Sequence, residues 1–236
     1  MRKYNYTVMM MKKAILLFTL SFIYITSNAQ DSTTASSVFI QNRLNKGETP
    51  RSLIKSGISM DSLYGKIYQG GYIFHFFAKD TSGLVMGTKN LKYDHDTTRY
   101  AIIWGCRNKL AGATGIKIGT GLSNSQKIVS HNCPIYDPDK RVWMKSAAEL
   151  CLLYKGAGYD DWYLPSKDEL HEALMNLSYT RKVDFGDVHF WTSSEKNDQF
   201  AWIEHMKFGW REYEFYGQSY YRKFYARYVR PIRNFN

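Results

Sequence analysis

The feature that most constrains the fold is an alternation of aromatic and charged residues between residues 188 and 235. Four runs carry it over much of their length: HFWTSSE, QFAWIEHMKFG, REYEFYG and YYRKFYARYVRPIRNF. Successive side chains of a β-strand point to opposite faces, so a period of two predicts strands with one buried face. This pattern is typical of antiparallel sheets. We therefore expect the C-terminal part of the chain to form an antiparallel meander.

Upstream of this region, strand and helix signals succeed one another. GGYIFHFFAKDTSGLVMGT is expected to form two strands joined by a turn at residues 79–83, and AIIWGC a further strand. A turn and a short helix are expected in IGTGLSNSQKIVSHNC, and longer helices over residues 145–154 and from Ser166 onward. Ser166 and Glu169 have the spacing of a capping box. The predicted class is α+β, with two central helices and a mainly antiparallel sheet.

The first 30 residues have the pattern of a signal peptide. Lys12 and Lys13 precede an apolar run over residues 14–25, and small residues follow up to Ala29. We expect a signal peptide over residues 1–29, translation starting at Met11, and export to the periplasm, the outer surface or the medium. The apolar run is shorter than the roughly 20 residues that span a bilayer, so no transmembrane segment is expected. No cysteine near the cleavage site could accept a lipid anchor.

Three further segments follow the predicted cleavage site. Residues 30–48 are polar and rich in Ser and Thr, which predicts a flexible leader. Residues 49–67 are expected to form a short helical lead-in, with Thr49 as the N-cap, Pro50 in the first turn and Gly57 at the end. Residues 68–236 are expected to form the main domain.

The charge of the chain limits its partners. The formal charge is +11, and the exported chain would retain +7, because the first 30 residues carry four cations and no acid. A basic exported protein can bind acidic polysaccharide, lipid headgroups or nucleic acid. The charge can equally be that of a solvated, lysine-rich surface. Of these partners we expect an anionic polysaccharide and no nucleic acid; the oligomeric state stays open.

Three cysteines remain in a compartment that favours disulfides. An odd number allows at most one internal bridge. Cys151 lies in AAELCLLYK, which has the apolar face of a helix and indicates a buried thiol. Cys106 and Cys133 lie near loops and are the better candidates for a disulfide, although the sequence leaves the pairing open.

No catalytic or metal-binding constellation emerges from the motifs. Asp160 and Asp161 are adjacent and lack a third oxygen ligand at loop spacing, so GYDDWYLPSKDEL is interpreted as a capped corner of the fold. The Gly-x-Gly in IGTGLSNS has Asn124 where a dinucleotide fingerprint needs glycine. His95 in DHD is interpreted as part of a polar loop, because the other histidines are scattered. We expect a protein without enzymatic activity, cofactor or metal.

The C-terminal tract is the best candidate for a binding surface. It combines tyrosines with arginines, and aromatic faces together with guanidinium groups suit sugar rings bearing anionic substituents. Alternation places roughly half of these side chains inside the fold. The loop over residues 209–224 is expected to be exposed and to bind the ligand, through the candidate residues Trp210, Arg211, Tyr216, Tyr220, Tyr221, Arg222 and Lys223.

Six separated motifs resemble a known family over residues 68–236. They are WGC at 104–106, IGTGLSNSQKIV at 118–129, AAELC at 147–151, GYDDWYLPSKDEL at 158–170, FWTSSE at 190–195 and YVRPIRNF at 228–235. Their order is similar to that in the C-terminal domain of bacterial collagen-like adhesins, formerly a domain of unknown function. The resemblance implies a C-type-lectin-like fold and an adhesin-like role in carbohydrate binding, directed at sulfated glycosaminoglycans and related polymers.

The resemblance has departures that leave alternatives open. The Gly-x-y repeat of the adhesins is absent, and so are the calcium-dependent sugar motifs of animal lectins. The corner also resembles that of the formylglycine-generating enzyme family, which implies an oxidase as an alternative. However, Tyr163 stands where that family has arginine, and Cys151 is the last cysteine, so the copper-binding pair near the C-terminus is missing. A structural subunit of a surface assembly is a third possibility.

Overall fold

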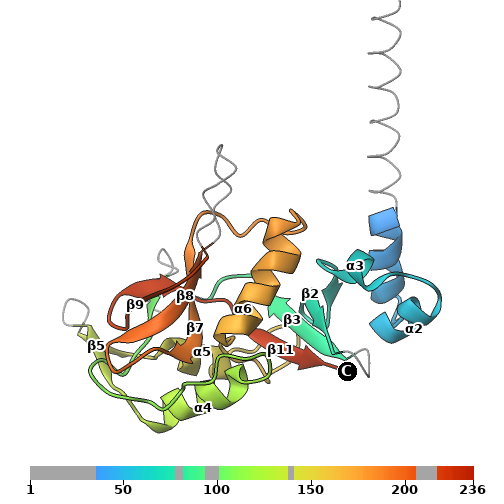
Figure 1. The fold of residues 1–236 in the computed structure, drawn as a ribbon. Helices are drawn as coiled ribbons and strands as arrows, with labels where there is room; N and C mark the ends of the chain where they lie inside the picture. Colours follow the sequence, from blue (N-terminus) through green and yellow to red (C-terminus); the bar gives the residue numbers. More distant parts are fainter. Residues whose placement is uncertain (1–35, 78–81, 94–100, 138–140, 206–216) are drawn as a thin grey trace, which may run out of the picture. The chain divides into compact units, whose positions relative to one another are not determined.

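The computed structural model describes residues 36–77, 82–93, 101–137, 141–205 and 217–236 (Figure 1). The chain divides into two compact units, residues 1–48 and 49–236, which are treated separately below. Within the first unit, residues 36–45 are helical. The expectation of a flexible leader over residues 30–48 therefore needs correcting for this stretch. The Arg43 guanidinium donates to the Glu48 carboxylate at 2.6 Å, an ion pair between the helix and the residue that ends the unit.

The second unit begins with the expected helical lead-in. Helix α2 spans Pro50–Lys55 and helix α3 spans Met60–Leu63. Thr49 caps α2 in a reciprocal capping box with Ser52, which satisfies backbone N–H groups that no helical carbonyl can reach. Gly57 has a φ of +94°, a left-handed conformation that glycine adopts without strain, and it ends the α2 turn.

The first sheet joins the two ends of the domain. Its strands, in the spatial order β1-β2-β3-β11, are β1 Ile67–Tyr68, β2 Gly71–Phe76, β3 Gly83–Gly87 and β11 Ile232–Phe235. All three pairings are antiparallel. The hairpin β2–β3 is the one predicted from the sequence. The C-terminal strand β11 pairs with β3, a connection that the strand patterns alone do not reveal.

The second sheet carries most of the alternating region. Its spatial order is β4-β10-β7-β8-β9, and its strands are β4 Ala101–Ile103, β10 Ala226–Tyr228, β7 His189–Glu195, β8 Phe200–His205 and β9 Gln218–Arg222. Strands β7, β8 and β9 form the expected meander. The next strand, β10, crosses back and pairs with β7 in parallel, so the prediction of a simple meander is wrong at that point. A separate hairpin joins β5 Ile135–Asp137 to β6 Val142–Met144.

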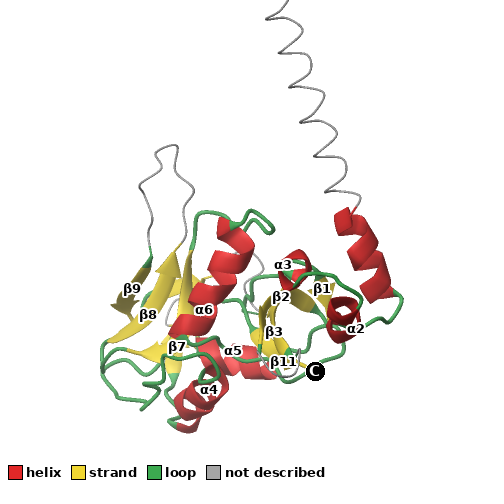
Figure 2. Cartoon of the chain, turned by 45° about the vertical axis from the view of Figure 1, so that its right-hand side comes forward, coloured by secondary structure: helices red, strands yellow, loops and turns green. Residues whose placement is uncertain are grey.

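Three α-helices pack on these sheets (Figure 2). They are α4 Gly121–Ser130, α5 Ala147–Leu153 and α6 Lys167–Ala173, the last continued by a π-helix over Leu174–Tyr179. Helices α5 and α6 are the two predicted central helices, and α4 is the predicted short helix. Helix α6 contacts β7 and β8 of one sheet and β2 of the other. The described elements form a mixed fold of mainly antiparallel sheets and a few helices, which is compatible with the predicted α+β class.

Two apolar cores result from this packing. One lies between α4, α5 and the second sheet, around Trp104 and Trp191. The other lies between α6, its π-helical extension and the first sheet, around Phe74 and Ile232. In the ranges that the structure describes, no helix combines the length and hydropathy that crossing a bilayer requires.

Candidate functional site

The corner GYDDWYLPSKDEL is occupied by structural contacts. Asp161 accepts two hydrogen bonds from the Arg233 guanidinium, at 2.5 and 3.0 Å, and that guanidinium lies 3.8 Å from the centre of the Tyr159 ring. Trp162 is fully buried. Asp161 therefore holds strand β11 against the corner. Over the described ranges, no group of three or more His, Cys, Asp or Glu side chains could hold a metal ion; His95 lies outside those ranges.

Three of the sequence motifs meet in one buried polar network. The Ser125 hydroxyl accepts from the Leu164 N–H at 3.1 Å. The Asn124 side chain makes two hydrogen bonds with the backbone of Gly115, and the Ser194 hydroxyl donates to the same Gly115 carbonyl at 2.6 Å. Buried polar groups stabilise a fold only when they are hydrogen-bonded. The network ties α4, the corner and β7 together, so these motifs form scaffold.

Several cations of the C-terminal tract point into the protein, as the alternation implies. Arg233 is held by Asp161. Arg230 is also buried: its guanidinium lies 4.5 Å from the centre of the Phe185 ring, and its Nε donates to the Asn90 side chain at 2.7 Å. Burial lowers the pKa of Arg230 to about 10. These arginines stack and pair inside the domain and are not part of an exposed surface.

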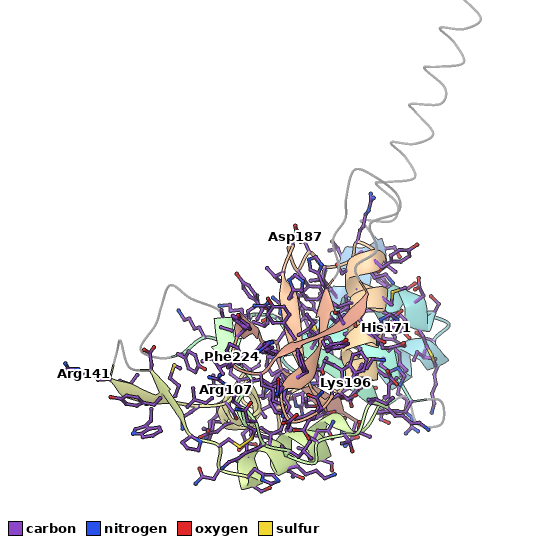
Figure 3. The ribbon with its side chains drawn as sticks, turned by 60° about the vertical axis from the view of Figure 1, so that its left-hand side comes forward. Arg107, Arg141, His171, Asp187, Lys196 and Phe224 are labelled. Carbon is purple, nitrogen blue, oxygen red and sulfur yellow. A yellow bond between two sulfur atoms is a disulfide. The ribbon has the colours of Figure 1, made fainter. Side chains whose placement is uncertain are left out.

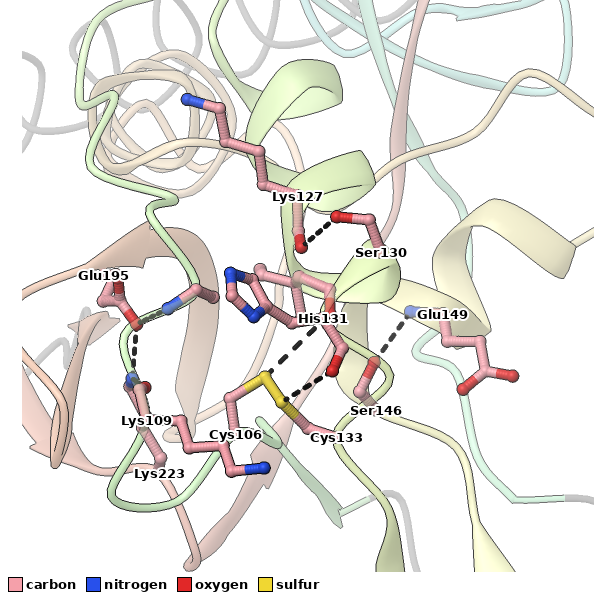
Figure 4. Close-up of a disulfide and its surroundings, with 12 residues drawn as sticks. Cys106, Lys109, Lys127, Ser130, His131, Cys133, Ser146, Glu149, Glu195 and Lys223 are labelled. Carbon is pink, nitrogen blue, oxygen red and sulfur yellow. Dashed lines mark hydrogen bonds and ion pairs between the residues drawn. A yellow bond between two sulfur atoms is a disulfide. The ribbon is translucent and has the colours of Figure 1, made fainter.

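Lys223 corrects the predicted ligand set. It is fully buried, whereas the sequence pattern predicted that it lies in an exposed loop. Its ammonium donates to Glu195 at 2.5 Å and to the Lys109 carbonyl at 2.9 Å, and it lies 4.6 Å from the centre of the Trp104 ring (Figure 4). Burial lowers the pKa of Lys223, and the hydrogen bond to Glu195 opposes this effect. Lys223 therefore positions the loop after β4 and cannot meet an external ligand in this conformation.

A disulfide fixes the same loop. The structure joins Cys106 to Cys133, the pair that the sequence favoured, and so links the end of β4 to the segment that leads into β5 (Figure 4). Cys106 has a φ of +48°, which is unusual for a residue with a side chain and shows how tightly the chain turns here. Cys151 is free and buried on α5. Burial raises the pKa of the Cys151 thiol, which makes it unreactive.

An exposed surface rich in aromatic rings lies on the face of β8 and β9 that points away from the Trp191 core. Trp202 is directly opposite Tyr220 in the register, and Phe200 is opposite Arg222. The centre of the Tyr220 ring lies 5.5 Å from that of Phe200 and 5.9 Å from that of Trp202, both edge to face. Tyr220 is 49% exposed. Cross-strand aromatic pairs of this kind stabilise a sheet and also present flat apolar faces.

Cations border these rings on two sides. The Lys196 ammonium lies 5.0 Å from the centre of the Trp202 ring, and the Arg222 guanidinium lies 5.7 Å from that of Phe200. Both cations are exposed. Such distances allow cation–π attraction, which holds the cations above the rings while leaving hydrogen-bond donors directed outward.

The surface continues toward the disulfide. Arg222 also lies 6.0 Å from the centre of the Phe224 ring, and Arg107 lies 4.4 Å from the same ring. Figure 3 shows Arg107 and Phe224 close together and Lys196 farther along the same side of the domain. We call this array the basic aromatic surface; it consists of Lys196, Trp202, Tyr220, Phe200, Arg222, Phe224 and Arg107.

A buried carboxyl lies beside this surface, on the same face of β8 as Trp202. Glu204 is completely buried on β8, and its Oε1 lies 2.9 Å from Nδ1 of His171 on α6. The other oxygen, Oε2, has no hydrogen-bond partner among the described residues. Burial raises the pKa of Glu204, and the hydrogen bond with His171 opposes this effect. The His171 side chain, labelled in Figure 3, is 38% exposed.

The structure brings together only part of the predicted ligand set. Tyr220 and Arg222 share one face of β9, whereas Tyr221 points to the other face, where Arg227 stacks on its ring at 3.8 Å. Lys223 is buried. The remaining predicted residues, Trp210, Arg211 and Tyr216, lie outside the described residues.

Sequence reasoning missed five members of the basic aromatic surface, namely Lys196, Phe200, Trp202, Phe224 and Arg107. Phe200 and Trp202 have the same parity on β8, which indicates a shared face, but the sequence does not show that β9 pairs beside them. Arg107 and Phe224 belong to distant loops. The buried Lys223 ammonium, which donates to the Lys109 carbonyl, and the Trp104 N–H, which donates to the Lys223 carbonyl, hold those two loops together.

Comparisons with known proteins add no family to this description. No protein-family model matches the chain, and no curated protein matches it.

Proposed function

We propose that this protein is an exported, non-enzymatic binding module and that its basic aromatic surface binds an anionic polysaccharide. The observation that carries the proposal is the continuous series of rings and cations from Lys196 and Trp202 through Tyr220 and Arg222 to Phe224 and Arg107. Binding through this surface needs no metal ion and no catalytic residue.

The chemistry of this surface suits an acidic sugar polymer. The face of a sugar ring is largely apolar and can pack on an exposed tyrosine or tryptophan, whose rigid ring loses little entropy on binding. Carboxylate or sulfate groups at the edges of the sugar can accept hydrogen bonds from lysine and arginine. A neutral polymer would make only the stacking contacts with the rings. A compact anion would make only the charge-assisted contacts with the lysine and arginine side chains.

We further propose that residues 68–236 adopt a C-type-lectin-like fold of the kind found in the C-terminal domain of bacterial collagen-like adhesins. Two mainly antiparallel sheets with helices α5 and α6 between their strands in sequence are compatible with that fold. The six motifs support the relationship, since three of them form the buried polar network and act as scaffold.

Binding to immobilised heparin and to uronate polymers at two salt concentrations tests the proposal. The Lys196→Ala/Arg222→Ala variant is expected to elute from heparin at clearly lower salt and to bind uronate polymers about tenfold more weakly, because two exposed charge-assisted contacts are lost. Tyr220→Ala is expected to weaken binding with little change in the salt dependence.

The matched control is Lys55→Ala/Lys127→Ala. It removes the same charge from exposed positions on α2 and α4. Equal weakening by the two double variants would mean that net charge alone drives retention. Absence of binding by the unaltered protein to every acidic polymer would refute the proposal, and self-association in sedimentation would then favour a structural subunit.

A further inference from the structure

The hairpin β5–β6 presents two exposed aromatic rings outside the basic aromatic surface. Tyr136 is directly opposite Trp143 in the strand register, and the centres of the two rings lie 5.0 Å apart. Tyr136 is 49% exposed and Trp143 is 68% exposed, which makes Trp143 the most exposed tryptophan that the structure describes. Aromatic pairs across strands stabilise a hairpin, but this pair leaves most of the tryptophan in contact with solvent. Exposed tryptophan and tyrosine are typical of binding surfaces.

The two rings lie on the outward face of the hairpin. Side chains alternate along a strand, so Ile135 and Met144, which are also opposite each other, lie on the other face. Met144 packs against the core around Trp104 and Trp191. Asp137 shares the face of Ile135, so its carboxylate is directed away from the two rings. In the described part of the hairpin, the outward face is therefore aromatic and carries no acidic side chain.

A pocket connects these rings with the basic aromatic surface. Its volume is about 400 Å³, within the range of small-molecule sites, and Tyr136 lines it together with Phe224 and Arg107 of that surface. The exposed Arg107 and Lys109 supply positive charge, and none of the described lining residues is acidic. Tyr136 in turn contacts Trp143. The contacts therefore run without a break from Phe224 through the pocket to Trp143.

Both ends of the hairpin are fixed to the rest of the domain. The disulfide joins Cys133, just before β5, to Cys106, which directly precedes Arg107. After β6, the Lys145 carbonyl accepts a hydrogen bond from the buried Tyr93 hydroxyl at 3.1 Å. A preorganised site loses less entropy on binding than a site that must be ordered. The two rings are thus held in place beside the pocket before any ligand arrives.

We infer that the binding site for the acidic polysaccharide extends across this pocket onto the hairpin, where Tyr136 and Trp143 form a second stacking platform for a sugar of the same chain. The inference rests on the proposed function. Figure 3 shows the same order across the domain: Arg141 at the hairpin, then Arg107 with Phe224, then Lys196.

The lining of the pocket favours this occupant over an apolar protein partner. The segment between the two aromatic areas carries cations and no described acid, which suits a chain of acidic sugars. A sugar stacked on the hairpin is tethered to the sugars on the basic aromatic surface, so its contact adds to the affinity of one continuous chain. Only a chain long enough to reach both areas gains this contact.

Hyaluronan oligosaccharides of two lengths test the extension by calorimetry on the full-length protein. Tyr136→Val/Trp143→Val removes both rings and keeps residues that favour strands. This variant is expected to bind the icosasaccharide about tenfold more weakly than the unaltered protein, because the second platform is lost. Its affinity for the tetrasaccharide is expected to change by about twofold or less, since the basic aromatic surface alone holds the short oligosaccharide.

Two single variants provide the controls. Lys196→Ala is expected to weaken both oligosaccharides by the same factor, because both lengths contact the basic aromatic surface. Tyr179→Ala removes an exposed ring from the π-helix, which packs on the first sheet, and is expected to change neither affinity.

Trp143 also gives a direct readout of binding. Acrylamide quenches the emission of exposed tryptophans, and the share that comes from Trp143 is the difference between the unaltered protein and Trp143→Phe. The icosasaccharide is expected to protect this share from quenching, whereas the tetrasaccharide is expected to leave it unchanged. The conservative Phe substitution makes this measurement independent of how well the double valine variant folds.

The remaining outcomes separate the two proposals. If the double valine variant binds the icosasaccharide normally while Lys196→Ala weakens both lengths, the extension is wrong and the basic aromatic surface stands. A change from dimer to monomer in sedimentation of that variant would then assign the hairpin to an interface between copies. Equal weakening of both lengths by the double valine variant, or no protection of Trp143, also overturns the extension. If no acidic polymer binds the unaltered protein, both proposals fail.

Discussion

Individual cations of the C-terminal tract have opposite roles, and burial distinguishes them. Arg222 is exposed on β9, whereas its neighbour Lys223 is buried and bound to Glu195. Glu195 also accepts from the N–H groups of Ala111 and Gly112, at 2.8 and 3.0 Å. A buried ion pair offsets its desolvation only when such additional hydrogen bonds satisfy it. The pair therefore fixes the geometry of the loop between β4 and α4.

Replacing Lys223 by Met is expected to destabilise the protein severely. The substitution leaves the Glu195 charge buried without its cation, which costs about 3 to 5 kcal/mol of unfolding free energy. Urea denaturation measures the loss. Lys223→Met/Glu195→Gln is expected to regain part of it, because neither charge is then buried. A loss below about 1 kcal/mol in Lys223→Met would contradict this account, and the exposed Lys127→Met provides the control.

Glu204 makes stability depend on pH in a defined direction. Its pKa is raised in the folded protein because its carboxyl is buried, so the folded state holds a proton that the unfolded chain has already released. As the pH falls from neutral through the folded pKa toward about 4.5, the folded state gains stability. Glu204→Gln removes the titrating group. The variant is therefore expected to lack the increase in stability that Glu204 gives the wild-type protein as the pH falls.

Thermal melts of both proteins between about pH 7 and about pH 4.5 measure the difference. The melting temperature of the wild-type protein is expected to rise relative to that of Glu204→Gln as the pH falls. His171→Asn, which removes the imidazole beside Glu204, is expected to retain a change of the same sign. A constant difference between wild type and Glu204→Gln across the range would show that Glu204 does not titrate as described.

At the scale of elements, helix caps and a local hairpin were easier to predict than the pairing of strands that lie far apart in the sequence. The N-cap at Thr49 and the capping box at Ser166 are local, because each depends on residues three positions apart, and both are present. The β2–β3 hairpin is equally local. The parallel pairing of β10 with β7 depends on contacts between distant segments, which periodicity does not encode. For the same reason alternation predicted that about half of the C-terminal cations are buried but did not identify which.

Helix α4 is fastened to the corner through a glycine. A Cβ on Gly121 would lie 2.3 Å from Oε2 of Glu169 and 2.9 Å from the Leu164 carbonyl oxygen. Both neighbours are fixed, since Glu169 caps α6 and Leu164 belongs to the corner. The sequence shows this glycine only as part of a turn, because the close approach involves a segment far along the chain.

Gly121→Ala is therefore expected to destabilise the protein, although alanine favours helices. Overpacking at this contact is expected to lower the unfolding free energy by about 1 to 3 kcal/mol. Denaturant melts measure it, with Ser123→Ala on the exposed side of α4 as the control. The account fails if Gly121→Ala is as stable as Ser123→Ala.

At the scale of the whole molecule, the disulfide closes a long segment of chain. Cys106 and Cys133 are 27 residues apart, and the closed loop contains helix α4. A cross-link of this length restricts the unfolded chain and is expected to add about 3 to 4 kcal/mol to stability, in the chain-entropy description. The candidate surface depends on the same cross-link, because Arg107 follows Cys106 directly.

Cys106→Ser/Cys133→Ser is expected to fold with lower stability. Guanidinium melts are expected to show a loss of about 3 to 4 kcal/mol, and a reducing agent should produce the same shift in the wild-type protein. Cys151→Ala retains the disulfide and is the control. Its melt should still shift when a reducing agent is added. Identical melts of oxidised and reduced wild-type protein would rule out the expected contribution.

The pairing of β11 with β3 has a consequence for how the chain reaches its native state. Residues 83–87 remain an open sheet edge until residues 232–235 arrive, so the first sheet is completed only after residue 235 has been synthesised. Contacts between such distant segments slow folding, and an unpaired edge can pair with another chain in the meantime. During that interval the edge of β3 is the part of the first sheet that is open to pairing with another chain.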